Sequence, residues 1–476
     1  MCNKADEVAL KKIFLDTGAK DMPGVVVAYR NLEAKYEASA QTIKELQLAG
    51  LEANAIRPNA MGSLNSGSIP EVKPPQNSAE EAKRRSAQPK LSESQLFPPV
   101  NSEAGHVSHP IAGKELNLRG GSNAQGFQGR TATGKTALVV ICYNRPKYLE
   151  KTLGSIMLHY PDQGGPDVFI SQDGNNLPVQ NVISKFKLKF KENHGGDVTH
   201  LKHVQAGGAN GYEKLAKHFG WALKQLFEVH QAKRVIILED DLEIAPDFFD
   251  YFLAMAPILD DDDTVMAVSA WNDNGQSQHV TDAKSVVRSD FFPGLGWMLN
   301  ERVWKEWGPK WPRGYWDDWL REPPQRKGRV TLRPEISRTH TFGVKGVSHA
   351  QFFKKFLGSN TLSKDHVAWG SIDFSYLKKD NFDAELKESV NKAREVRAGE
   401  AKANRNKCTE DLKVKYNSLH RGPQPTFFSV ASILGIMQDS KAKVPRTAYN
   451  GVVQVRCGHG SERRIFVVPS ETVRLV

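Results

Sequence analysis

The sequence predicts an α/β fold built on a mainly parallel sheet. Three short runs of branched apolar residues, at 137–141, 168–170 and 235–238, are typical of strands buried on both faces. Helical segments follow the first run at 146–158 and precede the third at 212–227. Strands that alternate with helices pair in parallel through crossover connections. The order along the chain therefore predicts a parallel sheet covered by helices.

Each element is supported by its own residues. The three strand segments read Ala-Leu-Val-Val-Ile, Val-Phe-Ile and Val-Ile-Ile-Leu, without polar interruption. In the second helical segment, Leu215, Phe219, Leu223 and Leu226 recur at helical spacing, so that helix presents one apolar face. No internal repeat accompanies these elements.

The first 130 residues differ in composition from the rest. In residues 1–56, apolar side chains at near-heptad spacing over 30–55 predict a partly helical stem. A solvated helix is the favoured interpretation, and a self-associating stalk is the alternative. Residues 57–130 are rich in Ser, Pro, Gly, Asn and Gln, and they bury too little apolar surface to offset their chain entropy. We expect a flexible linker there.

Charge and hydropathy limit the classes of partner. The chain of 476 residues carries a net charge of +11, but its basic residues are dispersed and no nucleic-acid-binding motif accompanies them. We therefore expect no nucleic-acid partner. No apolar run approaches the roughly 20 residues that a membrane helix needs, and no secretory signal is visible. We expect a soluble chain, with no membrane anchor in this sequence.

The four cysteines give no metal signature. Cys2, Cys142, Cys408 and Cys457 are widely spaced and form no CxxC pair. This spacing indicates neither a zinc site nor a dense disulfide framework. A single bridge between Cys408 and Cys457 is compatible with an oxidising compartment, but spacing alone leaves it open.

Polar residues follow the three strands, at the ends where open α/β sheets bind ligands. Arg145 follows the first strand, Asp173 follows the second, and Glu-Asp-Asp at 239–241 follows the third. One acid would serve to cap the helix that begins near Pro246. Three adjacent acids repel one another unless a cation lies among them, and carboxylates suit Mg²⁺ or Mn²⁺. The triplet predicts a metal site, with helix capping as the alternative.

Six longer motifs extend this pattern over residues 137–470. They are Ile-Ile-Leu-Glu-Asp-Asp-Leu-Glu-Ile-Ala-Pro-Asp-Phe-Phe-Asp-Tyr-Phe (236–252), Ser-Ala-Trp-Asn-Asp-Asn-Gly (269–275), Phe-Phe-Pro-Gly-Leu-Gly-Trp (291–297), Tyr-Trp-Asp-Asp-Trp-Leu-Arg (315–321), Arg-Pro-Glu-Ile-Ser-Arg (333–338) and Val-Pro-Arg-Thr-Ala-Tyr (444–449). Together they resemble the N-acetylglucosaminyltransferase I family. Several long motifs in one order are far more specific than a lone acidic triplet.

The resemblance implies a fold, a reaction and a location. The implied fold is a GT-A type α/β domain that binds a nucleotide sugar, at 131–345, plus a smaller C-terminal α+β domain that completes the site, at 346–476. The implied reaction moves N-acetylglucosamine from UDP-GlcNAc to mannose with inversion, and it uses a divalent metal, usually Mn²⁺. Family members work in the Golgi.

The resemblance also assigns roles to residues of this chain. Asp241 matches the direct metal ligand and Asp317 matches the catalytic base. Among the donor contacts, Asp173 matches the residue that holds the uracil. Without the resemblance, His218 would read as a partly buried helix histidine. The residues that match donor contacts are Arg145, Asp173, His218, Asp240, Leu295, Trp316 and Ser348.

The segment around Asp317 has a chemical logic of its own. Trp316 and Trp319 flank this acid in the sequence. Two large rings would partly desolvate the carboxylate and raise its basicity, as a general base requires. The alternative is a packed loop with solvated acids.

The expected acceptor is a mannose-terminated N-glycan on a glycoprotein. By the resemblance, transfer goes to the terminal α1,3-linked mannose of an oligomannose glycan in β1,2 linkage, the first step toward hybrid and complex glycans. One alternative is a transferase of the same family that acts on O-linked mannose of proteins. Another is a non-catalytic carbohydrate-binding protein, which the intact motifs around Asp241 and Asp317 disfavour.

Overall fold

The sequence-based expectations for the N-terminal part concern residues that the structure does not describe. The predicted stem at 1–56 and linker at 57–130 lie outside the described residues, as does Ser348. The residues that the computed structural model describes are 134–204, 210–344, 346, 352–418 and 425–470.

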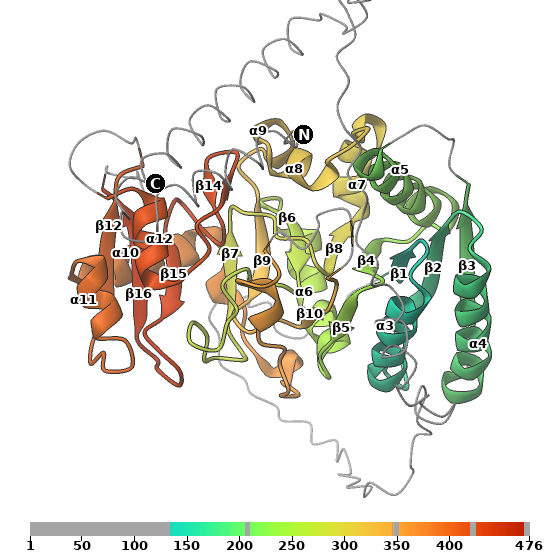
Figure 1. The fold of residues 1–476 in the computed structure, drawn as a ribbon, viewed down its shortest axis with the longest axis horizontal. Helices are drawn as coiled ribbons and strands as arrows, with labels where there is room; N and C mark the ends of the chain where they lie inside the picture. Colours follow the sequence, from blue (N-terminus) through green and yellow to red (C-terminus); the bar gives the residue numbers. More distant parts are fainter. Residues whose placement is uncertain (1–133, 205–209, 345, 347–351, 419–424, 471–476) are drawn as a thin grey trace, which may run out of the picture. The chain divides into compact units, whose positions relative to one another are not determined.

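An eight-stranded sheet forms the centre of the described part of the chain (Figure 1). In spatial order its strands are β3 (Val198–His203), β2 (Asp167–Asp173), β1 (Thr136–Cys142), β4 (Arg234–Glu239), β8 (Trp297–Asn300), β6 (Val265–Ser269), β9 (Val330–Pro334) and β7 (Val286–Ser289). Only β8 and β7 run against the others, because β8 pairs antiparallel with β4 and β6, and β7 pairs antiparallel with β9. The predicted α/β fold with a mainly parallel sheet is confirmed.

The three predicted strands lie next to one another at the centre of this sheet. Segments 137–141, 168–170 and 235–238 fall within β1, β2 and β4, and β1 pairs in parallel with both of the others. All residues of β1 after Thr136 are buried. A strand with neighbours on both sides and helices on both faces has no polar face, which explains the uninterrupted apolar runs.

Helices cover both faces of the sheet. Successive residues of β1 point to opposite faces, so Leu138 and Val140 pack into one core and Val139 and Ile141 into the other. The first core is covered by α3 (Pro146–His159), α4 (Leu177–His194) and α6 (Phe248–Asp261). The second is covered by α5 (Gly211–Lys224), α7 (Glu301–Trp307) and α8 (Trp316–Arg321).

Both predicted helices are present. Segment 146–158 is α3, and segment 212–227 is α5 continued by the π-helical turn η3 (Gln225–Val229). The remaining short elements of this part are β5 (Leu242–Ile244), η4 (Gly308–Lys310), α9 (Pro323–Arg326), β10 (Thr339–Thr341), η5 (Leu357–Ser359), η6 (Trp369–Ser371) and η7 (Ser375–Leu377). Strands β5 and β10 form a separate antiparallel pair directly after the acidic triplet.

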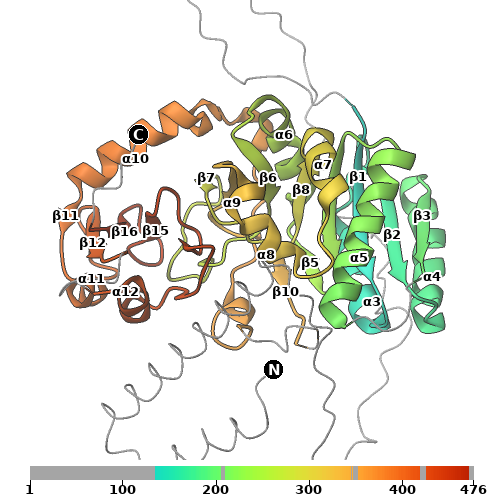
Figure 2. The ribbon, with the colours of Figure 1, turned by 90° about the horizontal axis from the view of Figure 1, so that it is seen from above.

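A second, four-stranded sheet forms the smaller C-terminal α+β part. Its order is β11 (Arg394–Glu395), β12 (Leu412–Tyr416), β16 (Arg464–Pro469) and β15 (Val453–Arg456). Helices α11 (Ala398–Ala403) and α12 (Phe427–Leu434) share its core, and β13 (Ser440–Lys441) and β14 (Val444–Pro445) form a small hairpin. Helix α10 (Lys379–Lys392) leads from the large sheet to the small one (Figure 2) and buries Phe382 and Leu386 in the core of the large sheet.

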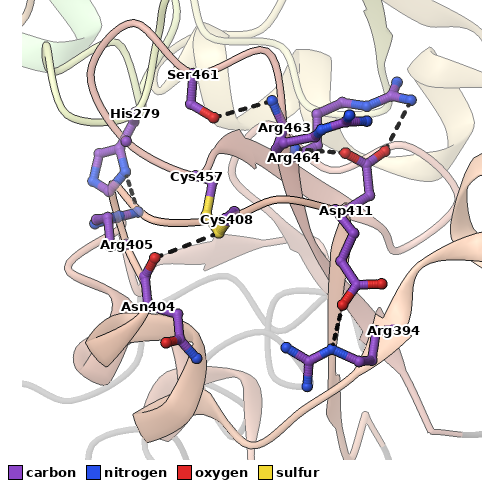
Figure 3. Close-up of a disulfide and its surroundings, with 12 residues drawn as sticks. His279, Arg394, Asn404, Arg405, Cys408, Asp411, Cys457, Ser461, Arg463 and Arg464 are labelled. Carbon is purple, nitrogen blue, oxygen red and sulfur yellow. Dashed lines mark hydrogen bonds and ion pairs between the residues drawn. A yellow bond between two sulfur atoms is a disulfide. The ribbon is translucent and has the colours of Figure 1, made fainter.

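A disulfide crosslinks the C-terminal part. Cys408 and Cys457 are joined, with their Cα atoms 6.2 Å apart (Figure 3), so the bridge that the sequence left open is present. Cys142 is a free, buried thiol in β1. None of the helices in the described part of the chain combines the length and the hydrophobicity that crossing a bilayer requires.

Candidate functional site

The ends of β1 and β4 bring Arg145 into contact with the acidic triplet. Because these strands pair in parallel, Ile141 lies opposite Glu239, and the residues after them leave the sheet on the same side. Arg145 is the residue before the first turn of α3. Its guanidinium donates to Oδ2 of Asp241 at 2.9 Å and to Oδ1 of Asp240. Arg145 therefore holds Asp240 and Asp241, and all three were predicted to be site residues.

Burial and neighbouring negative charges raise the pKa values of two acids at the end of β4. Burial, with the charges of Asp241 and Asp240, raises the pKa of Glu239 to about 8 despite the opposing effect of Arg145. Burial also raises the pKa of Asp240 to about 6, again against the pull of Arg145. The charge of Asp317 contributes to the raised pKa of Glu239, so the two acidic motifs lie close enough to interact.

The same cluster suits a divalent cation. Oδ2 of Asp240 is buried and has no hydrogen-bond partner within the described part of the chain. A Cβ at Gly343 would lie 2.2 Å from Oδ2 of Asp241, so a glycine is needed beside that carboxylate. Among the described residues, no three Asp, Glu, His or Cys side chains form a complete ligand set. An ion held by Asp241 would take further ligands from water and substrate phosphates, as Mg²⁺ and Mn²⁺ sites commonly do.

Asp173 lies at the end of β2, beside a pair of histidines. Its Oδ1 is 2.8 Å from Nδ1 of His203, at the end of β3. The ring of His203 stacks on the ring of His218, with centroids 5.3 Å apart. His218 is buried on α5, and its Nε2 lies 2.8 Å from Oγ of Ser171. Burial and the neighbouring His203 lower the pKa of His218 to about 3, so the ring is neutral near pH 7.

Asp317 is held by a buried arginine. Nη1 of Arg321 donates to Oδ2 of Asp317 and to Oδ1 of Asp318, at 2.8 Å each. Arg321 is itself fixed, since its Nε donates to the backbone oxygen of Phe292 at 2.9 Å. The Asp317 side chain retains 42% of its exposure. The carboxylate is therefore partly buried, and a charged hydrogen bond from Arg321 orients it.

The tryptophans around Asp317 are part of the core. Trp316 is 6% exposed and stacks on Phe219 at 4.5 Å and on Trp297 at 5.6 Å between ring centroids. Trp319 is partly buried and packs edge-on against Trp311. These rings anchor α8 against the second core, which fixes the position of Asp317 at the start of that helix. A contact between Trp316 and the sugar stays a prediction.

Leu295 occupies a tight turn close to the acidic triplet. Its φ is 54°, and it lies between Gly294 and Gly296, which also have positive φ. The hydroxyl of Thr339 donates to the backbone oxygen of Leu295 at 2.6 Å and holds the turn. A bulky residue with positive φ is uncommon and is found where the surroundings enforce it. The turn therefore places Leu295 in a defined position at the side of the predicted sugar site.

Sequence reasoning missed the residues that hold the predicted ones. Arg321 orients Asp317, and His203 and Ser171 contact Asp173 and His218. Only Arg321 had a local signal, because residues four apart face each other on a helix. His203 is 30 residues from Asp173 in the chain, so only the pairing of β2 with β3 brings them together.

The comparisons with known proteins settle the family. The GNT-I family matches residues 121–476 of the chain. The chain belongs to the GNT-I family. A relative from Arabidopsis thaliana, alpha-1,3-mannosyl-glycoprotein 2-beta-N-acetylglucosaminyltransferase, is 41% identical over 346 residues, which cover 71% of this chain and 74% of the relative. The resemblance of the six motifs is thereby confirmed.

Two solved structures show weak similarity to this member of the GNT-I family. The mannosyltransferase PcManGT from Pyrobaculum calidifontis, in complex with GDP-Man and Mn²⁺, shows 14% identity and a TM-score of 0.30, and the match covers 45% of this chain and 61% of that one. The TarS protein of S. aureus shows 14% identity and a TM-score of 0.29, with 46% and 38% covered.

Proposed function

We propose that this GNT-I family member is an inverting transferase that moves N-acetylglucosamine from UDP-GlcNAc to a terminal α1,3-linked mannose of an oligomannose N-glycan. The product would carry a β1,2 linkage and would open the route to hybrid and complex N-glycans. The name of the 41% identical plant relative supports the reaction. The single observation that carries the proposal is that Arg145 holds Asp240 and Asp241 together at the end of β4, beside the buried, unpartnered Oδ2 of Asp240.

In this proposal Asp317 acts as the general base. The hydroxyl of the acceptor mannose would lie about 2.6–3.2 Å from its carboxylate and would lose its proton as it attacks the sugar carbon. Attack from the face opposite the leaving diphosphate inverts that carbon in one step, without a covalent intermediate. Arg321 would hold the carboxylate in position to accept that proton, because Arg321 is itself buried and fixed.

Asp241 is the proposed ligand of a divalent cation, and Asp240 the proposed contact to the donor sugar or ribose. When bound, a divalent ion such as Mn²⁺ neutralises the charge that develops on the departing diphosphate. The buried, unpartnered Oδ2 of Asp240 and the close approach of Gly343 to Asp241 support this assignment. Arg145 would add a permanent positive charge beside the phosphates.

The nucleotide would lie over the ends of β1 and β2. Asp173 is proposed to bind the uracil and His218 to contact the donor, with Leu295 and Trp316 beside the sugar. Ser348 is proposed to contact the diphosphate. The neutral state of His218 supports a role as a hydrogen-bonding group rather than a charge. The large sheet would thus bind the donor, and residues from 346 onward would complete the site.

The disulfide supports an oxidising compartment for this reaction. Disulfides persist in secretory compartments and are rare in the cytosol, and Cys408 and Cys457 are bridged. The Golgi lumen, where N-glycans are processed, is the proposed location.

A competition assay tests the proposal. The purified full-length chain would be supplied with UDP-GlcNAc and Mn²⁺ and offered an oligomannose N-glycan and an O-mannosyl peptide together, with mass spectrometry as the readout. We expect one N-acetylglucosamine on the N-glycan, linked β1,2, and none after chelation. Preferential transfer to the peptide, or transfer from another nucleotide sugar, would show that the acceptor or the donor is wrong.

A further inference from the structure

A cavity of about 200 Å³ lies between the two sheets, away from the candidate functional site. Residues of β7, β9, α10, β15 and β16 line it. Strand β7 is the edge strand of the large sheet, whereas the candidate site lies at the ends of β1, β2 and β4. The volume is far above the roughly 30 Å³ that one water molecule takes up in the liquid. The cavity therefore has room for more than an isolated buried water.

Arg333, in the wall of this cavity, is a buried cation without a carboxylate partner. The side chain is 3% exposed, and no ion pair joins it to any acid in the described part of the chain. Its Nη1 and Nη2 make only long contacts, at 3.4 and 3.5 Å, to the backbone oxygens of Pro334 and Thr447. Its Nε has no hydrogen-bond partner.

Arg338, in the same sequence motif, is a buried arginine whose guanidinium has a carboxylate partner. It is also fully buried, but it contacts both carboxylate oxygens of Asp247 through Nε and Nη2, at 3.1–3.3 Å. A buried guanidinium that lacks such a partner is strongly destabilising unless water or an anion satisfies it. The contrast within one motif indicates that Arg333 has a different task from Arg338.

The acids near Arg333 are already neutralised by other residues. Glu335 receives Nε and Nη2 of Arg456, at 2.9 and 2.6 Å, and the backbone N–H groups of Thr281 and Asp282. Asp273, the other acid that acts on Arg333, is bonded to Arg446 at 3.0 Å. Burial lowers the pKa of Arg333 to about 10, so the guanidinium is still protonated at pH 7.

The remaining charges of the wall leave it net positive. Arg464 pairs with Glu385 and Asp411 at 3.4 Å each, and it donates to Oγ of Ser389 at 2.9 Å. Its contact with Asp411 is drawn in Figure 3. His279 is neutral at pH 7, because burial and Arg405 lower its pKa to about 4. The charged side chains that line the cavity are three arginines and two glutamates: Arg333, Arg456, Arg464, Glu335 and Glu385.

We propose that this cavity binds a small oxyanion of the phosphate or sulfate class, with Arg333 as its main partner and Arg464 as a second cation. The planar fork of a guanidinium matches tetrahedral oxyanions. The site is independent of the proposed transferase activity. The anion is either the free inorganic ion or the phosphate of a nucleotide. Its binding would join β9 of the large sheet to the β15–β16 hairpin of the small one.

The disulfide keeps one wall of the site in place. Cys457 directly follows Arg456 at the end of β15, and Cys408 lies between Arg405 and Asp411 (Figure 3). Arg405 donates to Nδ1 of His279 at 2.8 Å. The crosslink therefore fixes the hairpin that carries Arg456 and Arg464 next to the segment that contacts His279.

Anion titration of the full-length protein tests the site. Calorimetry and thermal unfolding would be measured at pH 7 and constant ionic strength, with chloride replaced stepwise by inorganic phosphate, by sulfate or by UMP. We expect saturable 1:1 binding of phosphate or sulfate, with a raised unfolding midpoint. In Arg333→Met the affinity should fall at least roughly tenfold, the effect of losing a charge-assisted hydrogen bond.

Two further variants make the result decisive. Arg397→Gln, an exposed arginine outside the cavity, should bind phosphate like the wild type. Arg464→Gln is the second cavity variant, and it is expected to weaken phosphate binding. Because Arg464 is more exposed than Arg333, this variant keeps the test available if Arg333→Met does not fold. UMP can also bind at the proposed donor site. UMP binding is therefore assigned to the cavity only where the cavity variants abolish it. Absence of saturable binding to the wild type, or binding unchanged in both cavity variants, overturns the proposal.

Discussion

Arg321 holds both acids of the Trp-Asp-Asp-Trp segment with a single nitrogen, yet the two acids are not equivalent. Asp318 is also approached by Lys441, at 3.4 Å. Asp317 is the acid whose charge reaches Glu239 in the acidic triplet. A base must face the donor site and must not be tied to a second cation. Asp317 meets both conditions better than Asp318.

Asp317→Asn is therefore expected to lower turnover by roughly 10²–10⁴, the contribution of a positioned general base. Donor affinity should be retained, because this residue serves the acceptor. Turnover with a mannose-terminated glycan and calorimetry with UDP-GlcNAc would measure the two effects. Asp318→Asn is the matched control and should lose little activity. Equal losses in the two variants would show that the segment has only a structural role.

Asp241→Asn should abolish metal-dependent transfer. A neutral amide is a weak ligand for a hard cation, and the same change removes the negative charge that Nη1 of Arg145 contacts. Initial rates over a range of Mn²⁺ concentrations, together with UDP-GlcNAc affinity, would detect both losses. The nearby surface acid Glu243, which pairs with Lys151, provides the control Glu243→Gln. An Asp241→Asn variant with wild-type turnover would exclude the assigned ligand.

The sequence was sufficient to find residues whose signal is local. Three acids after an apolar strand stand out in any α/β protein, and Asp317 was found by resemblance to the family. His203 could not be found this way, because its contact with Asp173 depends on which strands become neighbours. The packing of Trp316 on Phe219 and Trp297 could not be predicted either, because these rings come from distant parts of the sequence.

At the level of elements, the turn at 294–296 connects the sheet to the site. Gly296 has a φ of +90°, and a Cβ there would lie 2.6 Å from Cγ2 of Thr339 and 3.3 Å from Cδ2 of Leu238. Leu238 directly precedes the acidic triplet in β4. The turn can pack this closely against β4 only because position 296 has no side chain.

Gly296→Ala should destabilise the protein by about 1–3 kcal/mol, through unfavourable backbone conformation and steric overlap. The free energy of unfolding from urea titration would measure it, and donor affinity should fall as Leu295 shifts. Gly370→Ala is the control, because a Cβ there meets nothing within 4 Å. If the two alanine variants have the same unfolding free energy, the turn is more tolerant than its contacts indicate.

Among the secondary-structure elements, those with continuous apolar runs were predictable and the others were not. The segments in β1, β2, β4, α3 and α5 were identified from their apolar pattern. Helix α4 was not, because lysine alternates with apolar residues over 185–191, which mimics a strand, although Val179, Ile183, Phe186 and Phe190 face the core at helical spacing. Strands β7 and β8 have four residues each, too short to show a period.

Across the whole molecule, His279 links the part that carries the large sheet to the C-terminal part. Its Nε2 is 3.1 Å from the backbone oxygen of Gly435, and its Nδ1 accepts from Arg405 at 2.8 Å. This arrangement needs the neutral ring, with its proton on Nε2. A second proton on Nδ1 would remove the acceptor of the Arg405 hydrogen bond and would place two positive charges side by side.

Stability should therefore fall in acid through this group. The pKa of His279 in the folded protein is about 4, below the ordinary value of 6.5. Between these values the unfolded chain binds a proton that the folded chain does not, so the unfolding free energy decreases as pH falls from 6.5 to about 4. His279→Gln keeps a donor and an acceptor but cannot titrate. Urea midpoints from pH 7 to pH 4 should decline less steeply in this variant, and parallel curves would contradict the assignment.

The disulfide between Cys408 and Cys457 is a covalent crosslink within the C-terminal part. It joins residues 49 positions apart, from the loop before β12 to the end of β15, and the segment between them includes β12, α12 and the β13–β14 hairpin. A crosslink over a loop of this length restricts the unfolded chain much more than the folded one.

Replacing both cysteines by serine should lower the unfolding free energy by about 4 kcal/mol, the value that the chain-entropy model gives for a loop of this length. Because neither cysteine belongs to the candidate site, turnover should change little at a temperature where the C-terminal part stays folded without the bridge. Unfolding would be followed in urea with and without a reducing agent. The wild type should lose stability on reduction, and the double variant should not respond, which separates the bridge from other effects of the reductant. A wild type that is fully reduced by thiol counting, yet equally stable, would show that noncovalent contacts alone hold the C-terminal part.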